Sequence, residues 1–155
     1  MSRIAITGHR GMPPRANRLV EEAIRSRSAG VVAVSCLADG PDQIVARAVL
    51  EHGGGIEAVI PAEEYRAGLP EDARDAYDAL VGRAAEVHRM SRTESDSEAH
   101  MAASVSMVDH ADELWAVWDG EPARGYGGTA DVVACARQGG VPVQVIWPEG
   151  AARDA

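Results

Sequence analysis

The chain has 155 residues, a formal net charge of −9 and 46% hydrophobic residues. This length suits one domain with a sizeable core, and this apolar content excludes an intrinsically disordered protein. Because the chain is acidic and shows no basic stripe, we expect no nucleic acid among its partners. No apolar run reaches the length of a membrane span, and the first residues already form a strand pattern. We therefore expect no membrane partner, no signal peptide and a cytoplasmic location.

Strand patterns alternate with helical patterns along the whole chain. Short apolar runs predict strands at residues 3–7, 31–37, 56–60, 85–90, 114–118 and 141–147. Apolar residues at helical spacing predict helices near residues 19–25, 44–49, 62–83, 101–110 and 132–136. This alternation favours a parallel sheet covered by helices on both faces. We expect a single-domain, three-layer α/β/α fold with a mainly parallel sheet over residues 1–150, and a disordered tail at residues 151–155.

A glycine-rich stretch, residues 119–131, separates the fifth predicted strand from the last helix. Gly125, Gly127 and Gly128 come directly before Thr129, near the expected helix start. Such a turn points backbone N–H groups and the positive end of the helix dipole at a ligand, which favours an anion and most often a phosphate. The alternative is that these glycines simply make a tight turn before a helix start; Thr129 could both cap that helix and contact a phosphate. We favour phosphate binding, because ligands of parallel sheets bind beyond the carboxyl ends of the strands and two other loops belong on that edge.

The loop after the first strand contains Gly8, His9 and Arg10. The planar guanidinium of Arg10 suits a phosphate, to which His9 would donate a hydrogen bond. Both side chains could instead be solvated loop residues, and we favour the phosphate contact.

The loop after the second strand contains Asp39, Gly40 and Asp42. The two carboxylates would bind a ribose hydroxyl or a base, or would stabilise the start of the following helix. Both interpretations stay open. Farther along the chain, His100 lies on a predicted helix that could face the same cleft.

The segments Thr7 to Arg10, Ala38 to Asp42 and Gly125 to Thr129 resemble the strand-end loops of the SLOG superfamily. This Rossmann-like group includes the DNA-processing protein A domain, the Lonely Guy phosphoribohydrolases and molybdenum cofactor carrier proteins. The stretch from Met107 to Leu114 is also similar. The resemblance implies a nucleotide-derived ligand held across these loops and a homo-oligomer.

The chain departs from the Lonely Guy pattern at both catalytic positions. The position of the catalytic Glu is Val132, beside Asp131, and the position of the catalytic Arg is Ala103. Phosphate binding does not depend on either position, whereas glycosidic hydrolysis does. These two departures from the Lonely Guy pattern therefore favour binding over catalysis.

Two carboxylates are candidates for catalysis if any glycosidic cleavage takes place. Asp131 lies in the first turn of the last helix, where stabilising the helix dipole is the favoured role. Asp119 stands at the end of a strand, where it and Glu121 could bind a ribose, act as a base, hold Mg²⁺ beside a phosphate, or belong to a solvated loop. The histidines show no zinc-binding spacing, so we expect no metal site and no resident cofactor.

The sequence thus predicts a protein that binds a nucleotide or a phosphorylated nucleoside derivative, with the phosphate at the Gly125–Thr129 turn. The alternatives are an N-glycosidase of nucleoside 5′-monophosphates and a small-molecule carrier or sensor without catalysis. The residues expected to contact the ligand are Gly8, His9, Arg10, Asp39, Gly40, Asp42, Gly125, Gly127, Gly128 and Thr129.

Overall fold

The computed structural model describes residues 2–123 and 125–151. Within them, the strands are β1 (Ser2–Gly8), β2 (Val31–Ser35), β3 (Gly55–Ile60), β4 (Glu86–Arg89), β5 (Glu113–Val117) and β6 (Val143–Val145). The helices are α1 (Pro14–Arg25), α2 (Pro41–Glu51), the short 3₁₀ helix η1 (Arg66–Gly68), α3 (Glu71–Arg83), α4 (Ser97–Asp109) and α5 (Thr129–Gln138). No helix in these ranges is both long and apolar enough to cross a membrane.

The six strands form one sheet in the order β4-β3-β2-β1-β5-β6, and every neighbouring pair is parallel. The predicted α/β fold is confirmed, and the sheet is wholly rather than mainly parallel. The last strand is shorter than the predicted residues 141–147. It pairs on one side only, with β5, and Pro142 has no N–H to donate to a ladder.

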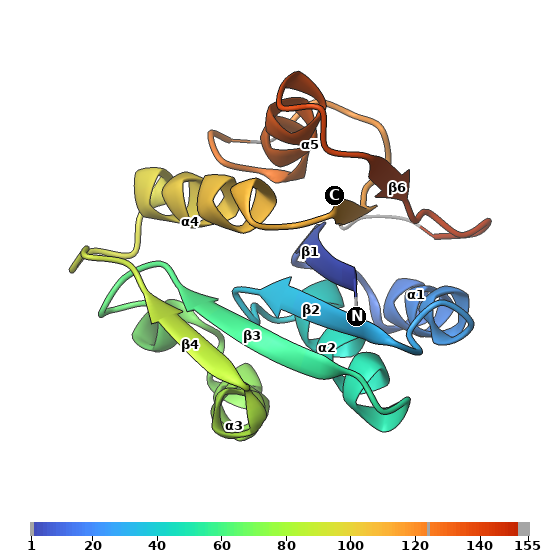
Figure 1. Cartoon of the computed structure of the whole chain (residues 1–155), viewed down its shortest axis with the longest axis horizontal. Helices are drawn as coiled ribbons and strands as arrows, with labels where there is room; N and C mark the ends of the chain where they lie inside the picture. The colour runs from blue at the N-terminus through green and yellow to red at the C-terminus, as the bar shows by residue number, and fades with distance from the viewer. Residues whose placement is uncertain (1, 124, 152–155) are drawn as a thin grey trace.

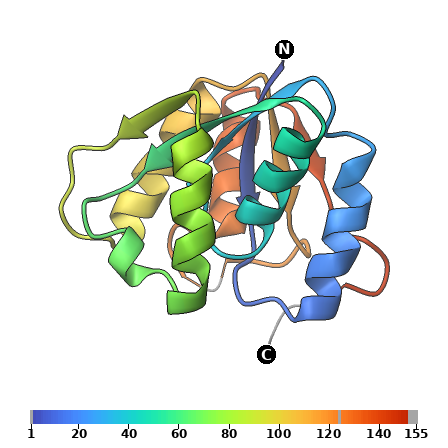
Figure 2. The ribbon, with the colours of Figure 1, turned by 90° about the horizontal axis from the view of Figure 1, so that it is seen from below.

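Helices cover both faces of the sheet (Figures 1 and 2). One face carries α1, α2 and α3, and the other carries α4 and α5. The first core contains residues such as Val20 of α1, Val49 of α2 and Leu80 of α3, and the second contains Met107 of α4 and Val133 of α5. This two-sided burial explains why the central strands are almost continuously apolar.

The C-terminal end of the chain follows β6. Ala151 is half-buried and packs against the first core. Residues 152–155, the rest of the predicted tail, lie outside the described residues.

The order of the strands determines where a ligand can enter. From β1 the chain steps outward through β2 and β3 to β4, and it then returns to the other side of β1 with β5. The strand order therefore reverses between β1 and β5, and the crevice beyond their carboxyl ends is the usual ligand site of such sheets.

Gly8 closes β1 at this point of reversal, and it is tightly enclosed. A Cβ atom added to Gly8 would lie 2.7 Å from Cβ of Pro41 at the start of α2 and 3.1 Å from Cβ of Val117 at the end of β5. Only glycine allows the end of β1 to approach the start of α2 and the end of β5 so closely.

We predict that Gly8→Ala lowers the free energy of unfolding by about 1–3 kcal/mol, because the added methyl group overpacks this junction. Urea denaturation followed by circular dichroism measures the change. Gly82→Ala is the matched control, since a Cβ at Gly82 of α3 meets no atom within 4 Å. An unchanged stability of Gly8→Ala would refute the close approach.

Candidate functional site

The loops that follow β1, β2 and β5 meet at the carboxyl edge of the sheet. A Cβ added to Gly40 would lie 3.6 Å from the carbonyl oxygen of His9, so the first two loops touch. Nε2 of His9 lies 3.1 Å from Oδ1 of Asp119, which joins the first loop to the third. The expected convergence of the three loops is therefore present in the structure.

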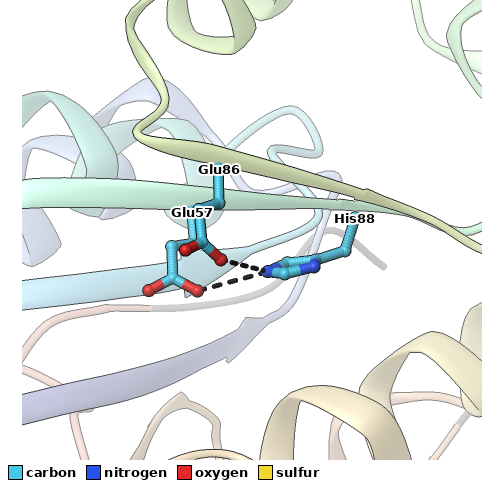
Figure 3. A group of neighbouring side chains, drawn as sticks. All are labelled: Glu57, Glu86 and His88. Atoms are coloured by element: carbon cyan, nitrogen blue, oxygen red, sulfur yellow. Dashed lines mark hydrogen bonds and ion pairs between the residues drawn. The ribbon is translucent and has the colours of Figure 1, made fainter.

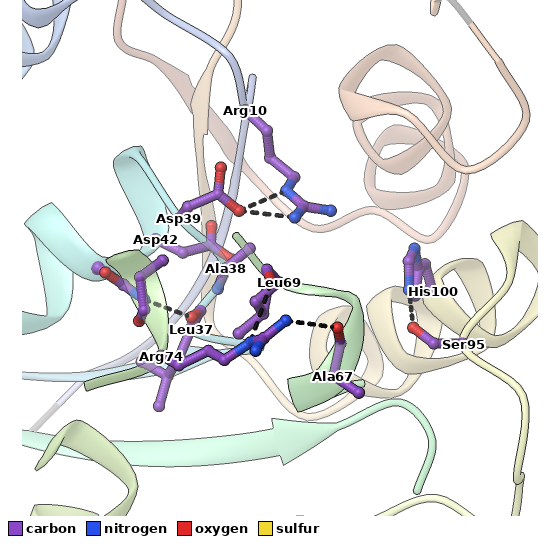
Figure 4. Close-up of polar contacts among 12 residues, drawn as sticks. Arg10, Leu37, Ala38, Asp39, Asp42, Ala67, Leu69, Arg74, Ser95 and His100 are labelled. Atoms are coloured by element: carbon purple, nitrogen blue, oxygen red, sulfur yellow. Dashed lines mark hydrogen bonds and ion pairs between the residues drawn. The ribbon is translucent and has the colours of Figure 1, made fainter. Parts of the chain in front are cut away.

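Arg10 and Asp39 form an ion pair across the first two loops (Figure 4). Nε and Nη2 of Arg10 donate to the same oxygen, Oδ1 of Asp39, at 2.9 and 2.6 Å. Nη1 of Arg10 has no hydrogen bond to any residue that the structure describes, and 42% of the side chain is exposed. Arg10 therefore retains donor capacity for an incoming anion.

A cavity of about 90 Å³ opens beside this ion pair. Three of the predicted ligand contacts line it, namely Gly8, Arg10 and Asp42. The remaining lining residues are Ile6, Thr7, Cys36, Ala38, Pro61, Tyr65 and His100. Pockets that enclose a whole drug-sized ligand have roughly 300–1,000 Å³, so this cavity suits only part of a nucleotide.

Asp42 is the most unusual group in the cavity. It lies in the first turn of α2, and its carboxylate accepts a hydrogen bond from the N–H of Ala38 at 3.2 Å. Burial raises the pKa of Asp42 from 3.8 to about 7. Asp42 thus binds the loop before α2 and does not cap the helix, and the same side chain reaches the cavity.

The other titratable groups of the cavity are held in neutral form. Burial raises the pKa of the Cys36 thiol and of the Tyr65 phenol well above their ordinary values. Burial and the nearby charge of Arg10 lower the pKa of His100. Among these groups Arg10 therefore contributes the positive charge, and the others offer neutral donors and acceptors.

Tyr65 is the site residue that the sequence analysis missed. It follows the end of β3, and its ring meets that of His100 edge-on at 5.6 Å. The loop after β3 has no glycine before Tyr65, and its acidic residues fit the helix predicted for residues 62–83, so composition did not mark it as a ligand loop. The parallel topology alone would have placed it on this edge.

Leu37 adds strain at the end of β2. Its φ of 58° lies in the left-handed region although the side chain is fully buried. Its N–H donates to Oγ of Ser35 and its carbonyl accepts from Nε2 of Gln43. Such a conformation costs of order 1–3 kcal/mol and is concentrated near functional sites. It also explains why β2 stops at Ser35, before the predicted end at residue 37.

The glycine-rich turn packs against α4, and none of its described residues lines the cavity. Gly127 has a φ of 84°, and a Cβ there would lie 3.0 Å from the carbonyl oxygen of Ser97. The N–H of Gly127 donates to Oδ2 of Asp131 at 2.9 Å. Asp131 therefore lies in the first turn of α5, as predicted, and its carboxylate binds the preceding turn, without capping a helical N–H.

Thr129 does not cap α5, so one of the two roles predicted for it is not observed. The helix begins at Thr129 itself, which is buried, and Gly128 is the N-cap residue without a side-chain bond. The backbone N–H of Thr129 is thus among the first N–H groups of α5, which have no acceptor within the helix.

His9 and Asp119 pair away from the cavity. His9 is buried, and its ring meets Trp147 edge-on at 5.7 Å. Nε2 lies 3.1 Å from Oδ1 of Asp119 and 3.2 Å from its backbone nitrogen. Oδ1 also accepts the N–H of Glu121. These contacts join the loops after β1 and β5, and they engage one of the two candidate catalytic carboxylates.

The two positions where Lonely Guy enzymes carry catalytic residues belong to the core. Val132 of α5 and Ala103 of α4 are fully buried in the second core. A charged residue could not replace either without an unpaired buried charge.

We predict that Asp42 makes stability depend on pH. The unfolded chain has a pKa near 3.8 at this residue and the folded chain about 7. Its favourable contribution is therefore complete below the unfolded value and is lost as the pH rises through the folded value. Asp42→Asn keeps an oxygen for the Ala38 N–H and cannot ionise.

The stability of Asp42→Asn relative to the original protein should therefore rise between about pH 4 and pH 7 and level off above the folded pKa. Urea denaturation at a series of pH values measures this difference. A difference that does not change with pH would contradict the buried, late-titrating carboxyl group.

Comparison with known proteins supports the fold. No protein-family model and no curated protein matches the chain. Among solved structures, DNA processing protein A of Streptococcus pneumoniae matches 92% of this chain and 49% of its own, with 19% identity and a TM-score of 0.69. The chain thus spans about half of that protein.

Two further structures are similar. DNA processing protein A of Helicobacter pylori, described for its single-stranded DNA binding mode, matches 98% of this chain and 68% of its own, with 15% identity and a TM-score of 0.72. The molybdenum cofactor binding protein of Rippkaea orientalis matches 92% of this chain and 74% of its own, with 15% identity and a TM-score of 0.58.

The expectation that nucleic acid is excluded as a partner is wrong. A protein of this fold binds single-stranded DNA, so the fold and the net charge of −9 do not exclude this class. The physical reason is that binding depends on the charge of one surface, whereas net charge sums over all of them. The chain has the Rossmann-like α/β fold that these proteins share, as its resemblance to the SLOG superfamily implies.

Proposed function

We propose that the protein binds a nucleotide or a phosphorylated nucleoside derivative at the carboxyl edge of the sheet. The phosphate contacts the Gly125–Thr129 turn, and the nucleoside part reaches the cavity beside Asp42. The observation that carries the proposal is the guanidinium of Arg10, which stands at the mouth of a cavity where the strand order reverses. A permanent cation at such a crevice favours an anionic ligand.

The two halves of the proposed site share one wall. Gly127 packs on Ser97 and Met101 of α4, and His100 of the same helix lines the cavity. A ligand can therefore extend along the first turns of α4 from the helix N-terminus of α5 to the cavity. The phosphate would meet the first N–H groups of α5 at one end of this path.

The lining groups suit a sugar or a base. The pKa of Asp42 is raised to about 7, so near neutral pH its carboxyl group is partly protonated and can both donate and accept hydrogen bonds. Tyr65 and a neutral His100 add an aromatic surface with polar atoms. Groups of this kind recognise hydroxyls and heterocycles, and the raised pKa of Asp42 reduces its negative charge near neutral pH.

Binding is a better proposal than hydrolysis. Asp131 is engaged with the N–H of Gly127, and Asp119 is engaged with Glu121 and His9. The positions that would hold the Lonely Guy catalytic pair are buried apolar residues. The function therefore fits a carrier or sensor of its ligand more closely than an N-glycosidase.

A thermal-shift panel tests the proposal. It compares AMP, ADP, ribose 5-phosphate, adenosine, inorganic phosphate and a short single-stranded oligonucleotide. A ligand at 100 times its dissociation constant stabilises the folded state by about 2.7 kcal/mol. We expect that stabilisation from a phosphorylated nucleoside and little from adenosine. If no phosphorylated compound raises the melting temperature, the proposal fails.

We predict that Arg10→Ala weakens the phosphorylated ligand about tenfold or more, since a charge-assisted hydrogen bond is worth roughly 1.5–3 kcal/mol. Isothermal titration calorimetry measures the affinity. Arg25→Ala is the matched control, because Arg25 is exposed at the end of α1 and pairs only loosely with Glu21 at 3.7 Å. Equal weakening in both variants would show that Arg10 has no specific role.

Asp131→Asn distinguishes binding from catalysis. Removal of a negative charge beside the first turn of α5 should tighten a phosphate about two- to fivefold, while the amide oxygen still accepts the Gly127 N–H. Calorimetry measures the affinity, and chromatography of AMP incubations measures release of the free base. Weaker binding in Asp131→Asn would contradict a phosphate at this turn. Free base that the variant no longer produces would instead identify Asp131 as catalytic.

A further inference from the structure

A second polar group lies on the sheet away from the strand-end loops. Glu57 of β3 stands opposite Glu86 of β4, and Val59 stands opposite His88. Because alternate residues of a strand share a face, the three polar side chains lie on the face that α4 covers, where Val59 is in the second core. Figure 3 shows the two carboxylates and the imidazole pointing toward one another.

The distances among these side chains are those of a chelating set. Nε2 of His88 lies 3.3 Å from Oε1 of Glu57 and 3.2 Å from Oε2 of Glu86. All three ligand atoms lie within 4.8 Å of one another. In a tetrahedral zinc site with metal–ligand bonds of about 2.1 Å, ligand atoms are about 3.4 Å apart. An ion can therefore enter with small side-chain movements.

Glu57 is already oriented for such a role. Its side chain is only 8% exposed, and Oε1 accepts a hydrogen bond from Nη2 of Arg3 at 2.8 Å. A carboxylate oxygen has lone pairs for both a donor and a metal, and ligating carboxylates are commonly hydrogen-bonded in this way. Arg3 thus positions Glu57, while Glu86 and His88 are exposed and free to adjust.

The charges favour a divalent cation. Two carboxylates and one arginine give the group a net charge of −1 when His88 is neutral. Like charges on directly neighbouring strands repel each other. A divalent ion bound between them would remove that repulsion and would join β3 to the edge strand β4.

A cavity adjoins the cluster and supplies room for further ligands. It has a volume of about 120 Å³ and is lined by Arg3, Val34, Val59, His88, Ser106, Met107 and His110. His88 belongs to both the cluster and the cavity, and His110 adds a second imidazole to the wall. Three protein ligands beside an open, partly apolar space form the arrangement in which a metal keeps an exchangeable position.

We propose that Glu57, Glu86 and His88 bind a divalent transition-metal ion, with its open coordination position facing this cavity. An imidazole with two carboxylates suits zinc, cobalt or manganese better than magnesium or calcium, which prefer oxygen ligands. The sequence did not predict this site, since His88 and Glu57 are 31 residues apart and no spacing rule connects them.

The test uses metal alone, without nucleotide, so that its outcome does not depend on the proposed function. The chelator-treated full chain is titrated with Zn²⁺ in a calorimeter, and with Co²⁺ while the visible absorption is followed. We expect one ion per chain. We expect His88→Gln and Glu86→Gln each to weaken binding about tenfold or more and to alter the cobalt spectrum.

Both substitutions are at exposed positions, so the variants should fold, and circular dichroism verifies this. His52→Gln is the matched histidine control at the end of α2, and it should bind like the original chain. Failure to bind one ion would overturn the proposal, as would affinity that both cluster variants retain. Loss of binding in His52→Gln alone would place the ion elsewhere and would equally overturn it.

Discussion

The position of β1 at the centre of the sheet is the constraint on which the site depends. Because β1 is hydrogen-bonded in parallel to β2 on one side and to β5 on the other, all three strands end at the same edge of the sheet. The loops that follow them begin at that edge. Gly8 lets these ends come together, with no Cβ to separate Pro41 from Val117. The cavity that Gly8 and Arg10 line lies beside this close approach.

The electrostatics of the cavity follow from burial. Burial keeps Tyr65 and Cys36 protonated, lowers the pKa of His100, and brings the pKa of Asp42 near neutrality. Burial disfavours the charged form of each group, whatever its sign. Burial also acts to lower the pKa of Arg10, but the hydrogen bonds and charge of Asp39 outweigh it and raise that pKa. The ion pair of Arg10 and Asp39 therefore stands beside largely neutral polar groups, within a chain of net charge −9.

The carboxylates of the glycine-rich turn and those of the sheet face have different partners. At the glycine-rich turn, Asp131 binds a backbone N–H and holds the start of α5. On the sheet face, Glu57 and Glu86 stand side by side, with Arg3 paired to Glu57 and His88 close to both. The carboxylate of Asp131 accepts a backbone hydrogen bond, whereas a bound cation would reduce the repulsion between Glu57 and Glu86. This contrast is why the metal proposal rests on β3 and β4 and not on the strand-end loops.

The sequence by itself determined the architecture, because alternating apolar runs and helical spacings allow few other arrangements than a helix-covered parallel sheet. It also determined which loops share the ligand edge, since every parallel strand ends there. The sequence also places apolar residues, Val132 and Ala103, where the resemblance would place catalytic residues. The structure shows that both pack in the second core.

Only the tertiary structure decided the remaining features. The raised pKa of Asp42 comes from burial among residues distant in sequence, and the pairing of Arg10 with Asp39 spans 29 residues. The cluster of Glu57, Glu86 and His88 arises from the register of two strands, and Arg3 joins it from 54 residues away. Local patterns predict elements because their causes are local, whereas burial, pKa values and ligand sets depend on which distant segments the fold places together.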